Sequence, residues 1–301
     1  CNYSLTYSMS GNTNHMSPDD HYQNLKRIIA AVGGKAKRIN VIMPFLYESR
    51  QHKRSSRESL DCALALQELT HMGVDNIITF DAHDPRVQNA IPLSGFETVR
   101  PTYQFVKGLL DRYDDLIIDS DHMMAISPDE GATERAVYLA NVLNLDMGMF
   151  YKRRDYTRVV NGRNPIVAHE FLGSSVEGKD VIILDDMISS GDSILDVAKQ
   201  LKSRNAKRIF AAATFGLFTN GLDKFDEAYE SGLIDGVLTT NLIYQTPELL
   251  SRPYYINCDM SKYVALMIDT LNHDGSISDI LDPSERIQVC VEEYKKAHGQ
   301  L

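Results

Sequence analysis

Two adjacent carboxylates, Asp185 and Asp186, stand between an aliphatic run and a loop of small hydroxylated residues. The run 181–184 predicts a strand that is buried on both faces, and the apolar spacing after Ser193 predicts a helix. Free backbone N–H groups in the loop 189–193 and in the first helical turn can hold a phosphate. Because both carboxylates would repel that phosphate, we expect them to face hydroxyl groups or a metal-bound part of the same ligand. A ribose phosphate meets both requirements, with its diol at the carboxylates and its 5′-phosphate at the loop.

A simpler interpretation of this stretch is a solvated acidic turn that caps a helix, with Ser190 or Asp192 near the N-cap. That interpretation accounts for the loop, but it does not explain two adjacent acids at the carboxyl end of a strand. In open α/β sheets, this edge is where ligands bind. We therefore favour a binding function for the stretch.

Two other loops place polar groups directly after predicted strands. Asp81 and His83 follow the strand predicted at 77–80, and Asp129 follows the strand predicted at 123–126. Taken alone, the first loop predicts an ordinary turn, and the second predicts a helix start with Asp129 as its cap. Their shared position at strand ends is what favours a functional interpretation.

Two basic loops complete the set of candidate groups. One contains Arg50 and Gln51, and the other contains Lys152 and Arg154. Guanidinium and ammonium groups suit the clamping of phosphates, where charge develops on oxygen atoms during transfer. Consecutive basic residues more often form only a solvated patch, so their place between the other loops is what makes them candidates.

Strands and helices alternate along the rest of the chain. Strands are expected at 39–43, 77–80, 123–126, 147–151, 181–184, 209–214 and 236–240, and a two-strand excursion is expected between residue 154 and Phe171. Helices are expected at 17–32, 60–72, 103–110, 134–143, 193–201, 222–229, 261–271 and 283–301, and the first sixteen residues are expected to form a loop. This alternation predicts an α/β fold with a mostly parallel central sheet flanked by helices.

Length and composition limit the possible classes of protein. A chain of 301 residues is long for one domain and sufficient for two. The formal net charge of −10 argues against a nucleic-acid partner. The four cysteines lie far apart, which predicts neither a disulfide framework nor a zinc site and favours a cytoplasmic setting. No apolar run approaches membrane-spanning length, so no membrane partner is expected.

The order of these motifs resembles that of the ribose-phosphate diphosphokinases, also called PRPP synthetases, over nearly the whole chain. The stretch from Val181 to Ser193 also resembles the PRPP-binding motif of type I phosphoribosyltransferases. In that motif two acids precede two apolar residues, an acid or threonine, and Thr-Gly-Gly-Thr. This chain has Ser189 in place of the acid, serines in place of both threonines, and Asp192 where a glycine is usual.

The resemblance implies two tandem phosphoribosyltransferase-like domains. Residues 1–146 would form the N-terminal, ATP-side domain, with the tail 284–301 packing on it, and residues 147–283 would form the ribose 5-phosphate side. Family members carry a Phe-x-x-Gly-Glu type adenine segment before the position of Cys1, so we expect the chain to lack its true N-terminus. The family forms dimers and hexamers, which implies a homo-oligomer.

The resemblance also assigns roles to residues, motif by motif. The Arg-Gln pair of the family binds ATP, which implies Arg50 and Gln51 here, while His52 stands where an acid is usual. In the family the histidine after one strand and the aspartate after another hold Mg²⁺, which implies His83 and Asp129 as metal ligands.

The remaining roles concern the transferred group and the sugar. The loop of Asp129, Glu130, Gly131 and Ala132 is implied to receive the diphosphate, although Ala132 replaces a glycine. Lys152 and Arg154 are the implied catalytic residues. The implied ribose 5-phosphate ligands are Asp185, Asp186, Ser189, Ser190, Gly191, Asp192 and Ser193.

The expected activity is Mg²⁺-dependent transfer of the diphosphoryl group of ATP to ribose 5-phosphate, giving 5-phosphoribosyl 1-diphosphate and AMP for nucleotide biosynthesis. Two alternatives stay open. A phosphoribosyltransferase would consume phosphoribosyl diphosphate, but it would leave the first domain unexplained. A non-catalytic regulatory homologue is compatible with Ser189, Asp192 and Ala132, but it gives no reason to retain Lys152 and Arg154.

Overall fold

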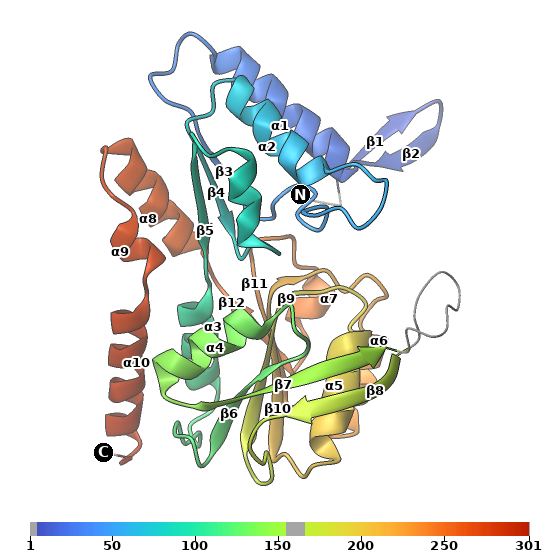
Figure 1. The fold of residues 1–301 in the computed structure, drawn as a ribbon, viewed down its shortest axis with the longest axis vertical. Helices are drawn as coiled ribbons and strands as arrows, with labels where there is room; N and C mark the ends of the chain where they lie inside the picture. The colour runs from blue at the N-terminus through green and yellow to red at the C-terminus, as the bar shows by residue number, and fades with distance from the viewer. Residues whose placement is uncertain (1–4, 155–165, 301) are drawn as a thin grey trace. The chain divides into compact units, whose positions relative to one another are not determined.

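The computed structural model describes residues 5–154 and 166–300, without the side chains of residues 152–154 and 166–169 (Figure 1). The chain divides into two compact units. Unit 1 comprises Cys1–Pro101 with Leu242–Tyr244, and unit 2 comprises Thr102–Asn241 with Gln245–Leu301. Unit 1 has a parallel sheet with one hydrophobic core, and unit 2 has a mostly parallel sheet with a core on each face.

A short hairpin precedes the first helix of unit 1. Strands β1 (Thr6–Met9) and β2 (Asn12–His15) pair antiparallel through a two-residue turn. Ser10 and Gly11 have φ values of 52° and 79°, and a type I′ turn requires positive φ at both positions. The prediction of a loop over this stretch was therefore wrong. The strand side chains are almost all exposed, so no apolar alternation marks the hairpin in the sequence.

Unit 1 is built on a three-stranded parallel sheet in the order β3-β4-β5. Its elements after the hairpin are α1 (Pro18–Val32), β3 (Asn40–Ile42), α2 (Asp61–His71), β4 (Asn76–Phe80), the 3₁₀ helix η1 (Pro85–Ala90) and β5 (Gly95–Val99). Helix α1 begins where the sequence predicts it. Ser17 and Asp20 form a capping box, in which each side chain accepts a hydrogen bond from the other residue's backbone N–H.

Unit 2 is built on a seven-stranded sheet in the order β12-β11-β10-β9-β6-β7-β8. Its strands are β6 (Met123–Ser127), β7 (Asp146–Arg154), β8 (Ile166–Leu172), β9 (Asp180–Ile188), β10 (Arg208–Gly216), β11 (Gly236–Thr240) and β12 (Tyr255–Cys258). All neighbouring strands are parallel except the β7–β8 pair. The predicted α/β fold with a mostly parallel sheet is thus confirmed.

Helices cover both faces of this sheet (Figure 1). Helices α3 (Thr102–Arg112), α4 (Thr133–Leu143) and α10 (Ser284–Ala297) pack on one face, and α5 (Asp192–Lys202), α6 (Asp223–Glu230) and α7 (Pro247–Leu250) pack on the other. Helices α8 (Ser261–Asn272) and α9 (Ser278–Leu281) contribute to neither of these two cores. Val181 and Ile183 of β9 pack in a core with α5 and α6. Ile182 and Leu184 pack in a second core with α3, α4 and α10. Strand β9 is therefore buried on both faces, as its aliphatic run predicts.

The compact units do not follow the predicted domain limits of 1–146 and 147–283. Strand β6 hydrogen-bonds to β9, and this pairing draws the residues from Thr102 onward into unit 2. The tail helix α10 packs against α3 and α4, which lie within the predicted first domain but belong to unit 2. The order of motifs along the chain carries no information about this strand pairing.

Besides the hairpin strands, β5 and β12 are also missing from the predicted elements. Strand β5 contains a glycine and a glutamate in five residues, and β12 has only four residues. Neither sequence shows the aliphatic run of a buried strand, yet each forms an edge strand of its sheet.

No helix within the described ranges 5–154 and 166–300 is both long and apolar enough to cross a bilayer.

A buried ion pair ties the start of β9 to β10. Asp180 accepts two hydrogen bonds from the Arg208 guanidinium, at 2.9 and 2.7 Å, and lies directly opposite it in the sheet. Asp115 accepts a third bond from Arg208 at 2.8 Å. The Asp180 side chain is only 4% exposed, whereas that of Asp115 is 69% exposed. Asp180 therefore supplies the shielded half of this cluster.

We predict that Asp180→Ala lowers the free energy of unfolding of unit 2 by about 3 kcal/mol, because it leaves a largely buried guanidinium without its main partner. Asp115→Ala removes an exposed partner of the same guanidinium and is expected to cost at most about 1 kcal/mol. Urea denaturation of both variants measures the difference. Equal losses would show that burial of Asp180 is not what gives the pair its strength.

Candidate functional site

The sequence predicted that the carboxylate pair follows the end of its strand. In the structure the pair lies within β9 instead. Strand β9 continues to Ile188 because it pairs with β10 as far as Gly216. On the other side, pairing with β6 stops at Ile183. Asp185 and Asp186 therefore stand where β9 extends past its β6 neighbour. This is the carboxyl edge of the sheet, at which ligands bind in open α/β folds.

Acidic groups gather at this edge. Asp186 is buried, and its backbone N–H donates to the Asp185 carboxylate at 2.8 Å. Burial, followed by the neighbouring Asp186 carboxylate, raises the pKa of Asp185 well above its usual value, and Asp129 after β6 contributes to the same shift. Hydroxyl donors or a cation at this place would reduce the cost of keeping these carboxylates ionised. Within the described ranges, however, no three His, Cys, Asp or Glu side chains are arranged to hold a metal by themselves.

The loop after β9 leads directly into α5. Gly191 has φ 82°, and an added Cβ would lie 2.5 Å from the ring of Phe225 on α6. The backbone of Ser189 accepts a bond from the Thr219 N–H at 2.9 Å, which joins the loops after β9 and β10. The first N–H groups of α5 have no acceptor within the helix. The loop thus presents backbone donors at a helix N-terminus, an arrangement that suits an anion.

Asp192 is the first residue of α5, and its side chain is exposed. Its carboxylate pairs with Lys224 of α6 and accepts a bond from the Ser190 hydroxyl at 2.9 Å. These two contacts, Lys224 first, lower the pKa of Asp192 below its usual value. Lys224 is absent from the candidates predicted from sequence, because 32 residues separate it from its partner.

The loop after β6 is closed by its own aspartate. Asp129 Oδ1 accepts hydrogen bonds from the N–H groups of Gly131 at 3.0 Å and Ala132 at 3.3 Å. The Ser127 hydroxyl donates to the Asp129 carbonyl at 2.6 Å. Ala132 is only 1% exposed, so its methyl group packs inward, whereas Glu130 and Gly131 are exposed. The alanine in place of a glycine therefore leaves the outer side of the loop open.

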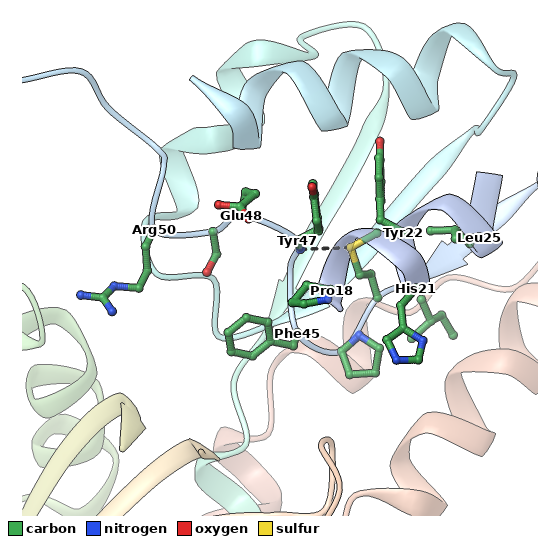
Figure 2. Close-up of a pocket in the computed structure, with 12 residues that line it drawn as sticks. Pro18, His21, Tyr22, Leu25, Phe45, Tyr47, Glu48 and Arg50 are labelled. Atoms are coloured by element: carbon green, nitrogen blue, oxygen red, sulfur yellow. Dashed lines mark hydrogen bonds between the residues drawn. The ribbon is translucent and has the colours of Figure 1, made fainter. Parts of the chain in front are cut away.

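In unit 1, the loop after β3 borders a pocket of about 280 Å³ (Figure 2). The wall is mainly apolar, and Arg50 and Glu48 belong to its lining. Figure 2 shows the Arg50 guanidinium extending away from the Phe45 and His21 rings, and Arg50 is exposed. Gln51 is half-buried, and its N–H donates to the Glu48 carbonyl at 2.8 Å.

Two aromatic rings stiffen this loop. Tyr22 of α1 and Tyr47 stack with ring centroids 4.3 Å apart and an interplanar angle of 5°. The Tyr47 hydroxyl donates to Asp19 at 2.7 Å, and the Tyr22 hydroxyl donates to the Ala65 carbonyl at 3.0 Å. Both rings were missed as neighbours of Arg50, because aromatic residues on a helix and a loop carry no local signal of stacking.

The loops after β3 and β4 bring two histidines together. The rings of His52 and His83 have centroids 5.1 Å apart at an interplanar angle of 60°. The pKa of His52 is lowered by burial and then by the His83 imidazole, while Asp84 and the Arg50 carbonyl act in the opposite direction. His83 was predicted as a metal ligand, whereas His52 was noted only as a departure from the family.

Lys152 and Arg154 lie in β7, whose backbone pairs with β8 opposite His169 and Ile166. Their side chains are outside the part of the chain that the structure describes. Their predicted catalytic role therefore rests on the sequence alone.

Two protein-family models match the chain. A model of the phosphoribosyl transferase domain matches residues 100–240, which lie almost entirely in unit 2. A model of the N-terminal domain of ribose phosphate pyrophosphokinase matches residues 8–73, which lie in unit 1.

Individual relatives agree with these matches. A ribose-phosphate pyrophosphokinase of Shewanella oneidensis is 30% identical over 263 residues, which cover 85% of this chain and 78% of that protein. The enzyme of the same name from Mycoplasma genitalium is 31% identical over 229 residues, or 75% of this chain. The chain spans only 65% of that relative's length and 66% of its Mycoplasma pneumoniae counterpart. The phosphoribosylpyrophosphate synthetase from Mycobacterium smegmatis shares the fold, with a TM-score of 0.73, 21% identity and 90% coverage of each chain.

We predict that Gly191→Ala destabilises unit 2 more than Gly178→Ala does. Both glycines have positive φ, but an added Cβ at Gly178 meets nothing within 4 Å. The left-handed backbone alone costs about 1–2 kcal/mol. The clash with Phe225 at Gly191 adds about 1–3 kcal/mol. Urea denaturation measures both variants, and equal losses would mean that Phe225 moves aside freely.

Proposed function

Because this chain belongs to the ribose-phosphate pyrophosphokinase family, we propose that it transfers the diphosphoryl group of ATP to ribose 5-phosphate. The products are 5-phosphoribosyl 1-diphosphate and AMP. The observation that carries the proposal is the carboxylate pair Asp185–Asp186 leading into a loop of backbone donors at the N-terminus of α5. The match of residues 8–73 to the N-terminal pyrophosphokinase domain favours this activity over that of a phosphoribosyltransferase.

Unit 2 supplies the groups proposed for the sugar and the diphosphate. Asp185 and Asp186 accept hydrogen bonds from the ribose hydroxyls, and the loop Ser189–Ser193 donates its N–H groups to the 5-phosphate. The loop Asp129–Ala132 receives the diphosphate on its amides. Because the Asp129 carboxylate holds two of these amides, it has to release them when the anion binds.

Unit 1 supplies the groups proposed for ATP. Arg50 is exposed at the rim of the 280 Å³ pocket, where its guanidinium is available to phosphates or to the face of a base. Gln51 follows it in the same turn. We include both in the ATP site.

The proposed cofactor is Mg²⁺, with His83 and Asp129 as its protein ligands. Mg²⁺ neutralises phosphate charge and prefers oxygen ligands, which the Asp129 carboxylate and the ATP phosphates provide. The described residues fit a cation in unit 1 as well, because a buried imidazole nitrogen of His52, beside His83, has no hydrogen-bond partner.

In the proposed reaction, the O1 hydroxyl of ribose 5-phosphate attacks the β-phosphorus of ATP in line and loses its proton to water. The new O1–P bond forms as the bond from the β-phosphorus to the oxygen that bridges it to the α-phosphate breaks, and AMP leaves. Charge spreads over the equatorial oxygens of the transferred group and the leaving AMP. Lys152 and Arg154 neutralise that charge. The proposal also includes a cytoplasmic, homo-oligomeric enzyme, a dimer or hexamer, in nucleotide biosynthesis.

The direct test is AMP release from Mg-ATP and ribose 5-phosphate by the full-length gene product. We expect AMP and 5-phosphoribosyl 1-diphosphate to form in equal amounts, and the paired change Asp185→Asn with Asp186→Asn to abolish both. AMP release that does not require ribose 5-phosphate, or no release at all, would contradict the proposal. Consumption of 5-phosphoribosyl 1-diphosphate with a nucleobase would identify a phosphoribosyltransferase instead.

Lys152→Ala is expected to lower turnover by several orders of magnitude while the affinity for ribose 5-phosphate stays nearly intact. The reason is that its proposed contact forms with charge that develops only in the transition state, so kcat falls more than binding does. Arg153→Ala removes one positive charge from the same stretch and serves as the matched control. Steady-state kinetics decide the matter, and normal turnover of the folded Lys152→Ala enzyme would remove this residue from the mechanism.

Asp192→Gly is expected to leave the KM for ribose 5-phosphate almost unchanged. Asp192 pairs with Lys224 on the exposed side of α5, and the loop binds the phosphate through backbone N–H groups that glycine also provides. A slight loss of stability is expected, because an acid in the first helical turn is favourable. A tenfold or larger fall in KM would mean that the carboxylate faces the sugar phosphate, and it would favour a regulatory homologue.

A further inference from the structure

His52 is a buried imidazole with an unused nitrogen. Its side chain is 10% exposed, and its Nδ1 atom has no hydrogen-bond partner among the described residues. A buried nitrogen that makes no hydrogen bond loses its interaction with water and gains nothing in return. A ligand that binds Nδ1 would remove this cost. The residue also stands in the position next to Gln51 where the resemblance leads one to expect an acid.

The nearest ring to His52 is that of His83, at a centroid separation of 5.1 Å and an interplanar angle of 60°. Metal–nitrogen bonds to imidazole are about 2.0–2.1 Å long, so two imidazoles on one ion at a near-tetrahedral angle have centroids roughly 5 Å apart. The observed separation agrees with this geometry. Without an ion, two neutral imidazoles stabilise each other little. An apolar ring at either position would provide the same burial and the same ring contact.

Asp84 completes the arrangement from the other side of His52. Its Oδ2 lies 3.6 Å from His52 Nε2, and its side chain is 12% exposed. The guanidinium of Arg86 holds this carboxylate through Nε, at 2.9 Å to Oδ1, and through Nη2. A fixed carboxylate beside Nε2 favours the tautomer that carries its proton there. The lone pair of Nδ1 is then free for a metal, as in carboxylate–histidine–metal sites.

We propose that His52 and His83 together bind one divalent transition-metal ion, with Asp84 as the positioning residue for His52. This extends the metal role given to His83 in the proposed function by adding a second imidazole from this chain's own departure at residue 52. Imidazole nitrogen suits ions such as Co²⁺, Ni²⁺ and Zn²⁺ far better than it suits Mg²⁺. The addition of His52 to His83 therefore shifts the preference of this ligand set from Mg²⁺ toward a transition-metal ion.

Two nitrogen ligands leave the rest of the coordination shell open. Since no described cluster of three or more His, Cys, Asp or Glu residues is arranged around one ion, the remaining positions belong to water or to phosphate oxygens of a bound nucleotide. Such a site binds its ion less tightly than a closed structural site, and it keeps positions available for a substrate.

The test is titration of the nucleotide-free, full-length protein with Co²⁺, followed by visible absorption and by calorimetry. We expect one Co²⁺ per chain to depend on both imidazoles, with His52→Ala and His83→Ala each weakening binding at least tenfold. Asp84→Asn is expected to weaken it by about tenfold, as loss of a group that orients a ligand does. His71→Ala removes an exposed histidine of the same unit and is expected to leave Co²⁺ binding unchanged.

The variant His52→Asp tests whether weaker Co²⁺ binding by His52→Ala is caused by loss of folding. It restores the acid that is usual in the family, and we expect it to weaken Co²⁺ binding while Mg²⁺ binding is kept or improved. If His52→Ala and His52→Asp bind Co²⁺ as tightly as the wild type, His52 is not a ligand and the proposal is overturned. Absence of a Co²⁺ site in the wild type would overturn it equally. Because no ATP or ribose 5-phosphate is present, this result is independent of the AMP-release assay.

Discussion

Burial of β9 on both faces decides where unit 2 can hold polar chemistry. The residues 181–184 face two hydrophobic cores, so charged side chains are tolerated only near the two ends of the strand. At one end, Asp180 is neutralised by Arg208. At the other end stand Asp185 and Asp186, and burial, followed by the neighbouring Asp186 carboxylate, raises the pKa of Asp185 well above its usual value. The same constraint thus places a structural ion pair at one edge of the sheet and the candidate binding site at the other.

The departures from the family motif fall on side chains, while the groups of the loop that are proposed to bind the anion are backbone N–H groups. Serine in place of acid or threonine leaves those donors in position. The aspartate at residue 192 adds a negative charge, which Lys224 neutralises on the exposed side of α5. Gly191 is different, because its positive φ and the ring of Phe225 both exclude a side chain. The backbone geometry of the loop therefore depends on Gly191, and its net charge depends on the ion pair of Asp192 with Lys224.

Sequence patterns that act over a few residues predicted the fold class and the position of the loop after β9. They failed for features that depend on contacts between residues far apart in the chain. The capping box at Ser17 and the aliphatic run 181–184 act over a few residues, so the sequence reveals them directly. The extension of β9 to Ile188 depends on pairing with β10, and the limit between the two units depends on pairing with β6. Lys224 and the His52–His83 contact join segments that are about thirty residues apart, and no spacing rule connects them.

The bonds from Asp129 to the amides of Gly131 and Ala132 make its carboxylate a built-in competitor for any anion. An incoming diphosphate and the carboxylate cannot occupy the same two N–H groups, so each binding event ejects an acidic side chain from the loop. The displaced carboxylate then lies near a second anion, and a cation close by would reduce the repulsion between the two. If the loop binds a diphosphate as proposed, anion and cation binding there are thermodynamically linked, and each raises the affinity for the other.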